Sequence, residues 1–219
     1  MTTKIFIPRD SSAIGLGANL VADALTRVTQ SNKADVQIVR NGSRGLIWME
    51  PLVEVETEAG RQGYANVNSN DVDSLFKTMF AGGGDQHEKS VGLVQEIPYL
   101  KNQERLCFAR NGITEPTSIE DYLGNDGCKG LKAALSLDGK SIVEIVTQSG
   151  LRGRGGAAFP TGIKWNTVLN CPADQKYIVC NADEGDSGTF SDRMTIEGDP
   201  FVLIEGMTIA ALAVGVAKG

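Results

Sequence analysis

Gly150-Leu-Arg-Gly-Arg-Gly-Gly-Ala-Ala-Phe-Pro-Thr-Gly-Ile-Lys-Trp165 combines glycines with positive charge in one short stretch. Three of its glycines remove Cβ atoms where a backbone must approach a ligand, and successive N–H groups can then bind an anion: Gly153, Gly155 and Gly156. Arg152, Arg154 and Lys164 add charge, and a helix starting near Thr161 would add its N-terminal dipole. The stretch therefore predicts a phosphate-binding loop.

This loop matches neither of two familiar phosphate-binding patterns. No Gly-Lys-Ser/Thr follows at the spacing of a Walker A loop. The order Gly153-x-Gly155-x-x-Ala158 fits only a relaxed dinucleotide fingerprint, and a helix rather than a strand is expected before it. A flexible connector between helices stays open as the alternative interpretation.

A second polar stretch begins 16 residues after Trp165. Lys176–Cys180 has the pattern of a buried strand and leads into Asn181-Ala-Asp-Glu-Gly-Asp186. Polar side chains at the end of a strand lie where open α/β sheets bind ligands. An acidic turn with Asx-type hydrogen bonds is the alternative. Taken together, the two stretches predict a nucleotide site, with the phosphate on the glycines and a planar ring edge on the polar stretch.

The first 80 residues predict a small α/β domain. The expected strands are Lys4–Ile7, Asp35–Arg40, Leu52–Thr57 and Gln62–Val67. One helix is expected from a Ser11 or Ser12 cap to about Gln30, with Leu16, Leu20, Ala24 and Val28 on one face. Another is expected from Ser69 to about Phe80. This order is that of a thioredoxin-like domain. No cysteine precedes Cys107, so neither a dithiol nor a metal cluster is expected here.

The rest of the chain predicts three further segments. Residues 81–96 read as a linker by composition, and residues 97–149 as a helical lead-in. Capping boxes at Thr117–Glu120 and Ser141–Glu144 are expected to open helices. Residues 150–219 are interpreted as the start of a Rossmann-like nucleotide-binding α/β domain that ends in an apolar helix.

Composition excludes several functions. With 21 Lys and Arg against 27 Asp and Glu, the net charge of −6 disfavours nucleic-acid binding. The apolar run Met207–Ala217 is too short to predict membrane insertion. The four cysteines lack ligand spacing, and His87 lies in a polar stretch, so no metal site is expected. Free cysteines and the absence of a signal-peptide pattern predict a cytoplasmic protein.

Three motifs resemble the flavoprotein subunit of NADH dehydrogenases, a family with members in respiratory complex I, NAD-reducing hydrogenases and NAD-dependent formate dehydrogenases. They are Gly150–Trp165, Cys180-Asn-Ala-Asp-Glu184 and Asp199-Pro-Phe-Val-Leu-Ile-Glu-Gly-Met207. The N-terminal part, with Asn41–Gly45 and Leu52–Val55, is most similar to the β (diaphorase) subunit of soluble molybdenum-dependent formate dehydrogenase. Gly185-Asp-Ser-Gly188 also favours that branch.

The resemblance implies FMN as cofactor, with hydride exchange between FMN and NAD(H). The FMN phosphate would be held by Gly153, Arg154, Gly155, Gly156 and Lys164. Asn181, Asp183 and Glu184 would face the flavin and nicotinamide, Glu184 being the residue expected to act at the reacting rings. Phe159 matches an aromatic that stacks on the NADH adenine, and Asp186 replaces a family glutamate near the nucleotide. Thr167 stands where the family has a second aromatic residue.

The resemblance also implies partners and further cofactors. Family members are about twice as long, and their C-terminal part carries a [4Fe–4S] motif that this chain lacks. A small iron–sulfur diaphorase subunit and a larger catalytic subunit are expected as partners. The chain is thus interpreted as part of an NADH:acceptor oxidoreductase, inactive by itself, within a formate dehydrogenase. The alternatives are a diaphorase subunit of a hydrogenase or of complex I, a non-catalytic docking fragment, and a nucleotide-binding protein without a redox role.

Overall fold

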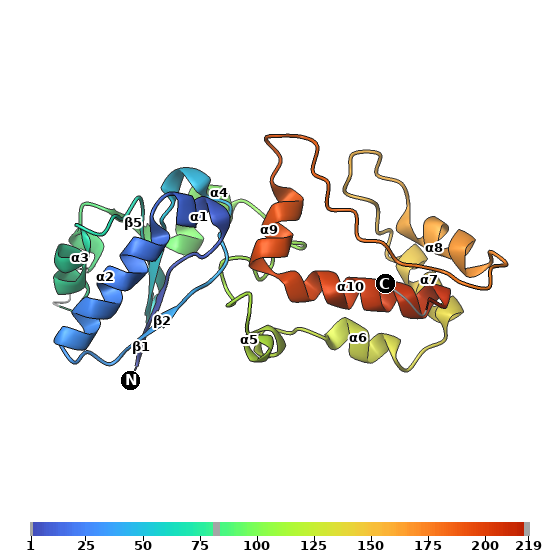
Figure 1. The fold of residues 1–219 in the computed structure, drawn as a ribbon, viewed down its shortest axis with the longest axis horizontal. Helices are drawn as coiled ribbons and strands as arrows, with labels where there is room; N and C mark the ends of the chain where they lie inside the picture. Colours follow the sequence, from blue (N-terminus) through green and yellow to red (C-terminus); the bar gives the residue numbers. More distant parts are fainter. Residues whose placement is uncertain (1, 81–83, 217–219) are drawn as a thin grey trace. The chain divides into compact units, whose positions relative to one another are not determined.

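The computed structural model describes residues 2–80 and 84–216 of the 219-residue chain. Its internal contacts divide the chain into two compact units. The first comprises Met1–Asp121 and Asp186–Asp199, and the second comprises Tyr122–Gly185 and Pro200–Gly219. Each unit is described by itself (Figure 1).

A five-stranded sheet forms the centre of the first unit, with strand order β2-β1-β3-β4-β5. The strands are β1 (Thr3–Phe6), β2 (Val36–Val39), β3 (Val53–Thr57), β4 (Gly60–Tyr64) and β5 (Ser90–Leu93). β1 and β2 are parallel, with Ile5 opposite Ile38, whereas the other neighbouring strands are antiparallel. A parallel β-α-β unit followed by an antiparallel hairpin is the thioredoxin-like arrangement, so the predicted α/β fold class is confirmed.

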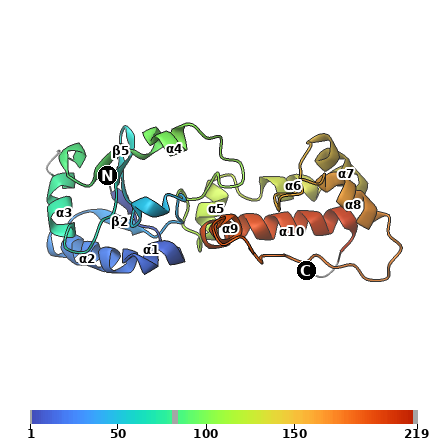
Figure 2. The same ribbon diagram turned by 90° about the horizontal axis from the view of Figure 1, so that it is seen from above.

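Helices cover both faces of this sheet. On one face, α2 (Ala18–Ser31) and α3 (Val72–Phe80) lie side by side, as both views show (Figures 1 and 2). The core on this face includes Ile5, Val53 and Leu75. On the other face, Leu46, Leu52 and Leu100 form a smaller core beside α4 (Pro98–Lys101). Three short 3-10 helices, at Ile47–Met49, Gly84–Gln86 and Val94–Glu96, complete this unit with α9 (Ser191–Gly198).

The first predicted helix is divided in two, which corrects the predicted buried face. α1 (Ser11–Gly15) is capped by Asp10, whose carboxylate accepts from the N–H groups of Ser12 and Ala13, rather than by a serine. The chain then turns at Gly17, whose φ is 101°, before α2 begins. On the predicted face, Ala24 is buried and Val28 packs against the core, whereas Leu16 and Leu20 are 54% and 63% exposed.

Two other boundaries in this unit differ from the sequence-based expectation. α3 begins at Val72 and the N–H of Leu75 bonds to the carbonyl of Asp71, so Ser69 lies too early to cap it. Strand β5 lies within the stretch expected to be a linker, because its backbone pairs with the free edge of β4. His87, just before β5, packs edge-on against Tyr64 with ring centroids 6.0 Å apart.

The second unit is helical in its described residues. It contains α6 (Lys129–Ala134), α7 (Gly139–Gln148), α8 (Thr161–Leu169) and α10 (Pro200–Val214), while α5 (Ile119–Gly124) crosses from the first unit into the second. The core between these helices includes Ile142, Val143 and Ala213. Figure 2 shows α6, α7 and α8 beside the C-terminal half of α10. None of the helices in the described ranges has both the length and the apolar character required to cross a membrane.

Several local predictions for this part of the chain are wrong in detail. α7 is capped by Asp138, which accepts from the N–H of Ser141 at 2.7 Å, so the helix starts before the predicted capping box. α5 is capped by Ser118 rather than Thr117. Lys176–Cys180 does not form a strand with any described neighbour, and Val179 is 83% exposed. Within this stretch only Tyr177 forms a β-bridge.

Candidate functional site

The glycine loop is closed at its base and open at its tip. A β-bridge joins Arg152 to Pro160, and the N–H of Gly153 donates to the carbonyl of Phe159 at 2.9 Å. α8 begins directly after this bridge. The N–H groups of residues 154–158 donate to no acceptor in the described parts of the chain. Five successive donors are thus available to an anion at the tip of the loop.

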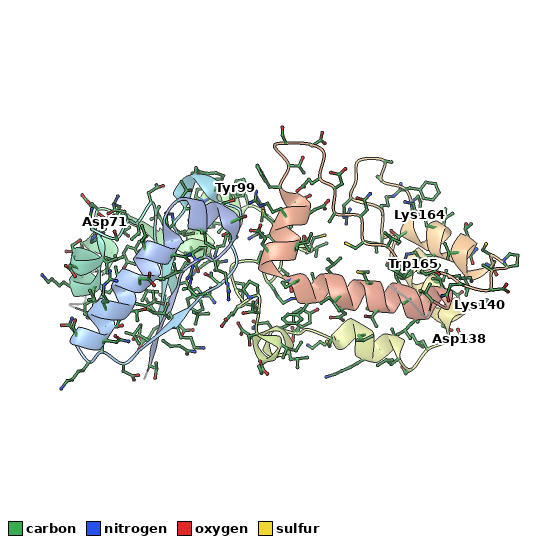
Figure 3. All side chains as sticks on the ribbon, viewed as in Figure 1. Asp71, Tyr99, Asp138, Lys140, Lys164 and Trp165 are labelled. Atoms are coloured by element: carbon green, nitrogen blue, oxygen red, sulfur yellow. The ribbon has the colours of Figure 1, made fainter. Side chains whose placement is uncertain are left out.

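Two cations beside this loop have no acidic partner. Arg154 is exposed, and Lys164 lies on the first turn of α8, where Figure 3 labels it next to Trp165. Neither forms an ion pair with any residue of the described ranges. The Lys164 ammonium lies 5.7 Å from the centre of the Phe159 ring. The structure therefore brings Phe159 close to both Lys164 and Gly153, with positive charge that no acidic residue in the described ranges neutralises.

The glycines of the loop are not required by packing within the described chain. A Cβ atom at Gly155 or Gly156 would meet nothing within 4 Å, and at Gly153 it would make ordinary contact with Phe159 at 3.7 Å. Gly156 has a φ of 99°, which favours glycine, whereas Gly155 has no such backbone constraint. The open space at Gly155 fits a phosphate group approaching the backbone, and so the residues present fit FMN at its phosphate end.

The polar stretch after residue 180 forms a turn rather than the end of a strand. The Asn181 side chain accepts from the N–H of Asp183 at 3.1 Å, which is the Asx-type bond of the alternative interpretation. Asn181 and Asp183 are exposed and make no hydrogen bond to the glycine loop. Glu184 is half-buried in the same unit. The contact of these three residues with a flavin or nicotinamide stays a prediction.

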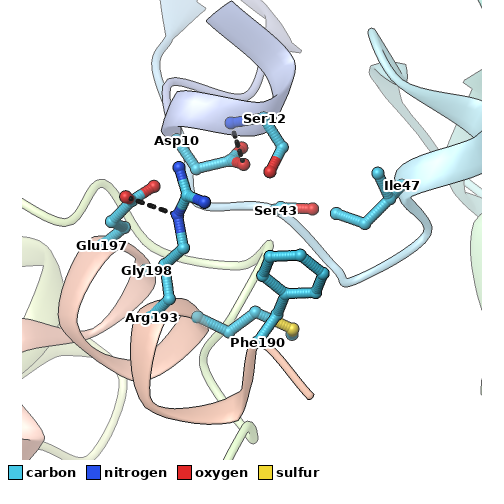
Figure 4. Close-up of a pocket in the computed structure, with 9 residues that line it drawn as sticks. Asp10, Ser12, Ser43, Ile47, Phe190, Arg193, Glu197 and Gly198 are labelled. Atoms are coloured by element: carbon cyan, nitrogen blue, oxygen red, sulfur yellow. Dashed lines mark hydrogen bonds and ion pairs between the residues drawn. The ribbon is translucent and has the colours of Figure 1, made fainter. Parts of the chain in front are cut away.

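Asp186 belongs to the first unit, in the segment that leads into α9. This segment is held there by several contacts: Ser11 donates its backbone N–H to Glu197 at 2.7 Å, and a Cβ at Gly42 would come within 2.6 Å of the Gly198 Cα. Figure 4 shows the small cavity at this contact, with the ion pair of Arg193 and Glu197 at 3.0 Å. The predicted role of Asp186 near a nucleotide remains untested.

That cavity measures about 10 Å³, which is room for one water molecule. Asp10 lines it, and the Oδ1 atom of Asp10 is buried without a protein hydrogen-bond partner. Burial, together with the nearby Glu197 charge, raises the pKa of Asp10 despite its backbone hydrogen bonds. A water in this cavity would satisfy the orphaned oxygen. Within the described ranges, no three His, Cys, Asp or Glu side chains gather closely enough to hold a metal ion.

Sequence reasoning missed the buried carboxylates of the first unit. Glu50 is 3% exposed and accepts from the Ser43 hydroxyl at 2.7 Å and the Leu52 N–H at 2.9 Å. Burial raises the pKa of Glu50 to about 7, although these hydrogen bonds oppose the shift. Glu54 is 1% exposed and pairs with Arg44. The alternating pattern of Leu52–Thr57 indicates one polar face but does not show that this face is buried.

Residues 146–219 match the model of the Nuo51 FMN-binding domain. The matched stretch contains the glycine loop, both cations and the Asx turn. Over 119 residues the chain is 49% identical to NADP-reducing hydrogenase subunit HndC of Solidesulfovibrio fructosivorans, covering 54% of this chain and 24% of that protein. Over 98 residues it is 48% identical to a subunit of the NADH-quinone oxidoreductase of Aquifex aeolicus, covering 45% and 23%. The matches thus span about a quarter of the length of these relatives.

Solved structures give weaker similarities. An NAD⁺-reducing [NiFe]-hydrogenase in the H₂-reduced state aligns over 98% of this chain and 35% of its own, at 22% identity and a TM-score of 0.41. A variant of the thioredoxin-like [2Fe–2S] ferredoxin from Aquifex aeolicus aligns over 41% of this chain and 98% of its own, at 21% identity and a TM-score of 0.37. The thioredoxin-like assignment therefore rests on the strand order of the first unit.

Proposed function

We propose that this chain is a component of an NADH:acceptor oxidoreductase in which the glycine loop and the first turn of α8 hold the phosphate of FMN. The observation that carries the proposal is the pair of unneutralised cations, Arg154 and Lys164, beside five N–H groups without acceptors. The match of residues 146–219 to an FMN-binding domain supports it. So do the names of the relatives, which are subunits of hydrogenases and NADH-quinone oxidoreductases.

The residues of the chain would bind and orient rather than react. When bound, FMN supplies the capacity to exchange a hydride with a nicotinamide. The N–H groups of the loop and the Lys164 ammonium would fix the phosphate, which positions the rest of the cofactor. Phe159 offers an aromatic face to the adenine of NADH, and Asn181, Asp183 and Glu184 offer hydrogen bonds to ring edges. Glu184, which is half-buried, is the proposed residue nearest the reacting rings.

The finer assignment to a soluble, cytoplasmic NAD-dependent formate dehydrogenase forms part of this proposal. It rests on the resemblance of Asn41–Gly45, Leu52–Val55 and Gly185–Gly188 to that branch. The proposed partners are a small iron–sulfur diaphorase subunit and a larger catalytic subunit. Affinity purification of this protein from its own cells, followed by assays for formate-dependent and H₂-dependent NAD⁺ reduction, distinguishes the branches. Recovery of hydrogenase activity alone would contradict the formate assignment.

The phosphate-binding role is tested by flavin retention. The chain is incubated with FMN, passed through gel filtration, and its visible absorbance is recorded. We expect a yellow protein, and we expect Gly155→Val to lose the flavin because two methyl groups would occupy the space that the phosphate needs. Gly15→Val is the matched control, since its Cβ also meets nothing within 4 Å but lies in α1.

The outcome also separates the alternative functions. A colourless chain that still binds partner subunits would favour a docking fragment without catalysis. Stoichiometric binding of ADP or ATP without flavin affinity would favour a nucleotide-binding protein. If Gly155→Val retains FMN as well as the Gly15→Val control does, the assignment of the phosphate site is wrong.

A further inference from the structure

The first unit contains a larger cavity of about 320 Å³ that the proposed function does not use. Its walls come from three separate parts of the chain: the loop before β3, the segment after α4 and the start of α9. The residues that matter here are Arg44, Trp48, Tyr99, Arg105, Phe108 and Phe190. All of them belong to the first unit, whereas the glycine loop belongs to the second.

Four aromatic side chains line this cavity: Trp48, Tyr99, Phe108 and Phe190. Trp48 and Tyr99 meet edge to face with ring centroids 5.3 Å apart, yet they remain 57% and 50% exposed. Phe190 is 41% exposed at the N-terminal end of α9. Large aromatic surfaces left in water are costly, and they are surfaces on which a planar ring can stack.

Arg105 provides a cation that the protein does not neutralise. Its Nη2 atom donates to the carbonyl of Arg44 at 3.0 Å, but its Nε atom is buried without a hydrogen-bond partner. It forms no ion pair with any residue in the described parts of the chain, whereas the neighbouring Arg44 is matched by Glu54 at 2.5 Å. Burial and the Arg44 charge lower the pKa of Arg105. An anion bound in the cavity beside Arg105 would match this charge.

We propose that this cavity binds a nucleoside monophosphate, with its base against the aromatic side chains and its phosphate on Arg105. The volume lies at the small end of the range for ligand sites, about 300–1,000 Å³, which suits one nucleotide better than a dinucleotide. Because the aromatic and cationic groups line a single cavity, one ligand carrying both a ring and an anion satisfies them together. The site is separate from the proposed FMN phosphate site.

The probe for the test is AMP, titrated into the 219-residue chain in a calorimeter. We expect saturable binding at one site. Arg105→Met should weaken it about tenfold or more, because the charge-assisted hydrogen bonds to the phosphate are lost. Tyr99→Ala removes an exposed ring and should weaken binding to a similar extent without unfolding the protein. Adenosine, which lacks the phosphate, should bind at least about tenfold more weakly than AMP.

Two control variants locate the binding. Lys101→Met removes one positive charge from neighbouring α4, where Lys101 is paired with the exposed Glu96, and should leave AMP affinity unchanged. Gly155→Val should also leave AMP affinity unchanged while it abolishes FMN retention, so this proposal and the proposed function fail independently. The inference is overturned if AMP shows no saturation up to about 10 mM. It is equally overturned if Arg105→Met and Tyr99→Ala bind AMP normally, if adenosine binds as well as AMP, or if Gly155→Val abolishes AMP binding.

Discussion

The carboxylate of Glu54 lies between two guanidinium groups inside the first unit. Arg44 donates to it at 2.5 and 2.8 Å, and Arg61 donates at 3.2 Å. Arg61 also donates to the carbonyls of Gly112 and Ile113 at 2.7 and 3.0 Å, and its guanidinium carbon lies 3.4 Å above the centre of the Phe6 ring. The network thereby fastens the segment after α4 to the sheet.

Removing the Glu54 carboxylate should strongly lower the free energy of unfolding. Glu54→Ala leaves two buried guanidinium groups without their counter-charge, which costs about 3–5 kcal/mol of unfolding free energy. The control is Glu96→Ala, which breaks the exposed pair with Lys101 and should cost less than about 1 kcal/mol. Urea denaturation of both variants gives the comparison. Similar losses of stability in the two variants would show that the buried network is not what holds this region.

Glu50 should make stability depend on pH in a defined direction. Its pKa rises from 4.5 to about 7 in the folded protein because of burial, with the Asp10 and Glu54 charges adding to the effect. The folded state therefore binds a proton more tightly, and its stability falls as the pH rises from about 4.5 to about 7. The contribution amounts to about 3 kcal/mol.

The matched variant for this prediction is Glu50→Gln, which does not titrate. Wild type should lose stability relative to Glu50→Gln across that pH range, as measured by urea denaturation at several pH values. A difference between the two proteins that stays constant from about pH 4.5 to about pH 7.5 would contradict the raised pKa of Glu50.

For individual residues, the sequence predicts the cationic glycine loop but not which charged side chains are buried. Phe159 lies close to both Lys164 and Gly153, while the role of these residues in binding a phosphate stays a prediction. Glu54 and the unmatched Arg105 could not be found, because their environments are made by segments far apart in the chain: Arg44 with Glu54, and the aromatic residues around position 105. Burial of this kind depends on tertiary structure, which no local pattern encodes.

Among the elements, the break between α1 and α2 depends on one backbone conformation. Gly17 has a φ of 101° at the N-terminal end of α2, which side chains with a Cβ atom rarely adopt. Gly17→Ala should therefore destabilise the first unit by about 1 kcal/mol. Gly15→Ala, two residues earlier in α1, should instead stabilise it by about 0.5–1 kcal/mol, because alanine is the better helix former. Urea midpoints that move in the same direction for both variants would contradict this account of the break.

The sequence predicts helices and strands well where their hydrophobic pattern is clear. It predicts strands poorly where their formation depends on pairing with a neighbouring strand. Strand β3 lies within one residue of its expected position, and α8 begins at Thr161, where its start was expected. The predicted start of α7 is too late because Asp138, three residues before Ser141, is the residue that caps the helix. Lys176–Cys180 has the composition of a strand, but only Tyr177 within it forms a β-bridge. Conversely, β5 has a weak pattern and forms because the edge of β4 is available.

For the whole molecule, the two units carry different kinds of site. The second holds the open, cationic glycine loop within the stretch that matches an FMN-binding domain. The first holds the aromatic cavity with Arg105 and the buried carboxylates. The α/β class and the position of the loop followed from sequence, whereas the placement of residues 186–199 with the first unit required the structure.

The central claim is that the glycine loop and Lys164 bind the phosphate of the flavin. It is tested most directly by titrating this chain with FMN and with riboflavin, which lacks the phosphate, and following the quenching of flavin fluorescence. We predict that FMN binds at least about 100-fold more tightly than riboflavin, and that Lys164→Met removes at least about tenfold of that preference because one charge-assisted contact is lost. Equal affinities for FMN and riboflavin, or a preference unchanged by Lys164→Met, would contradict the claim.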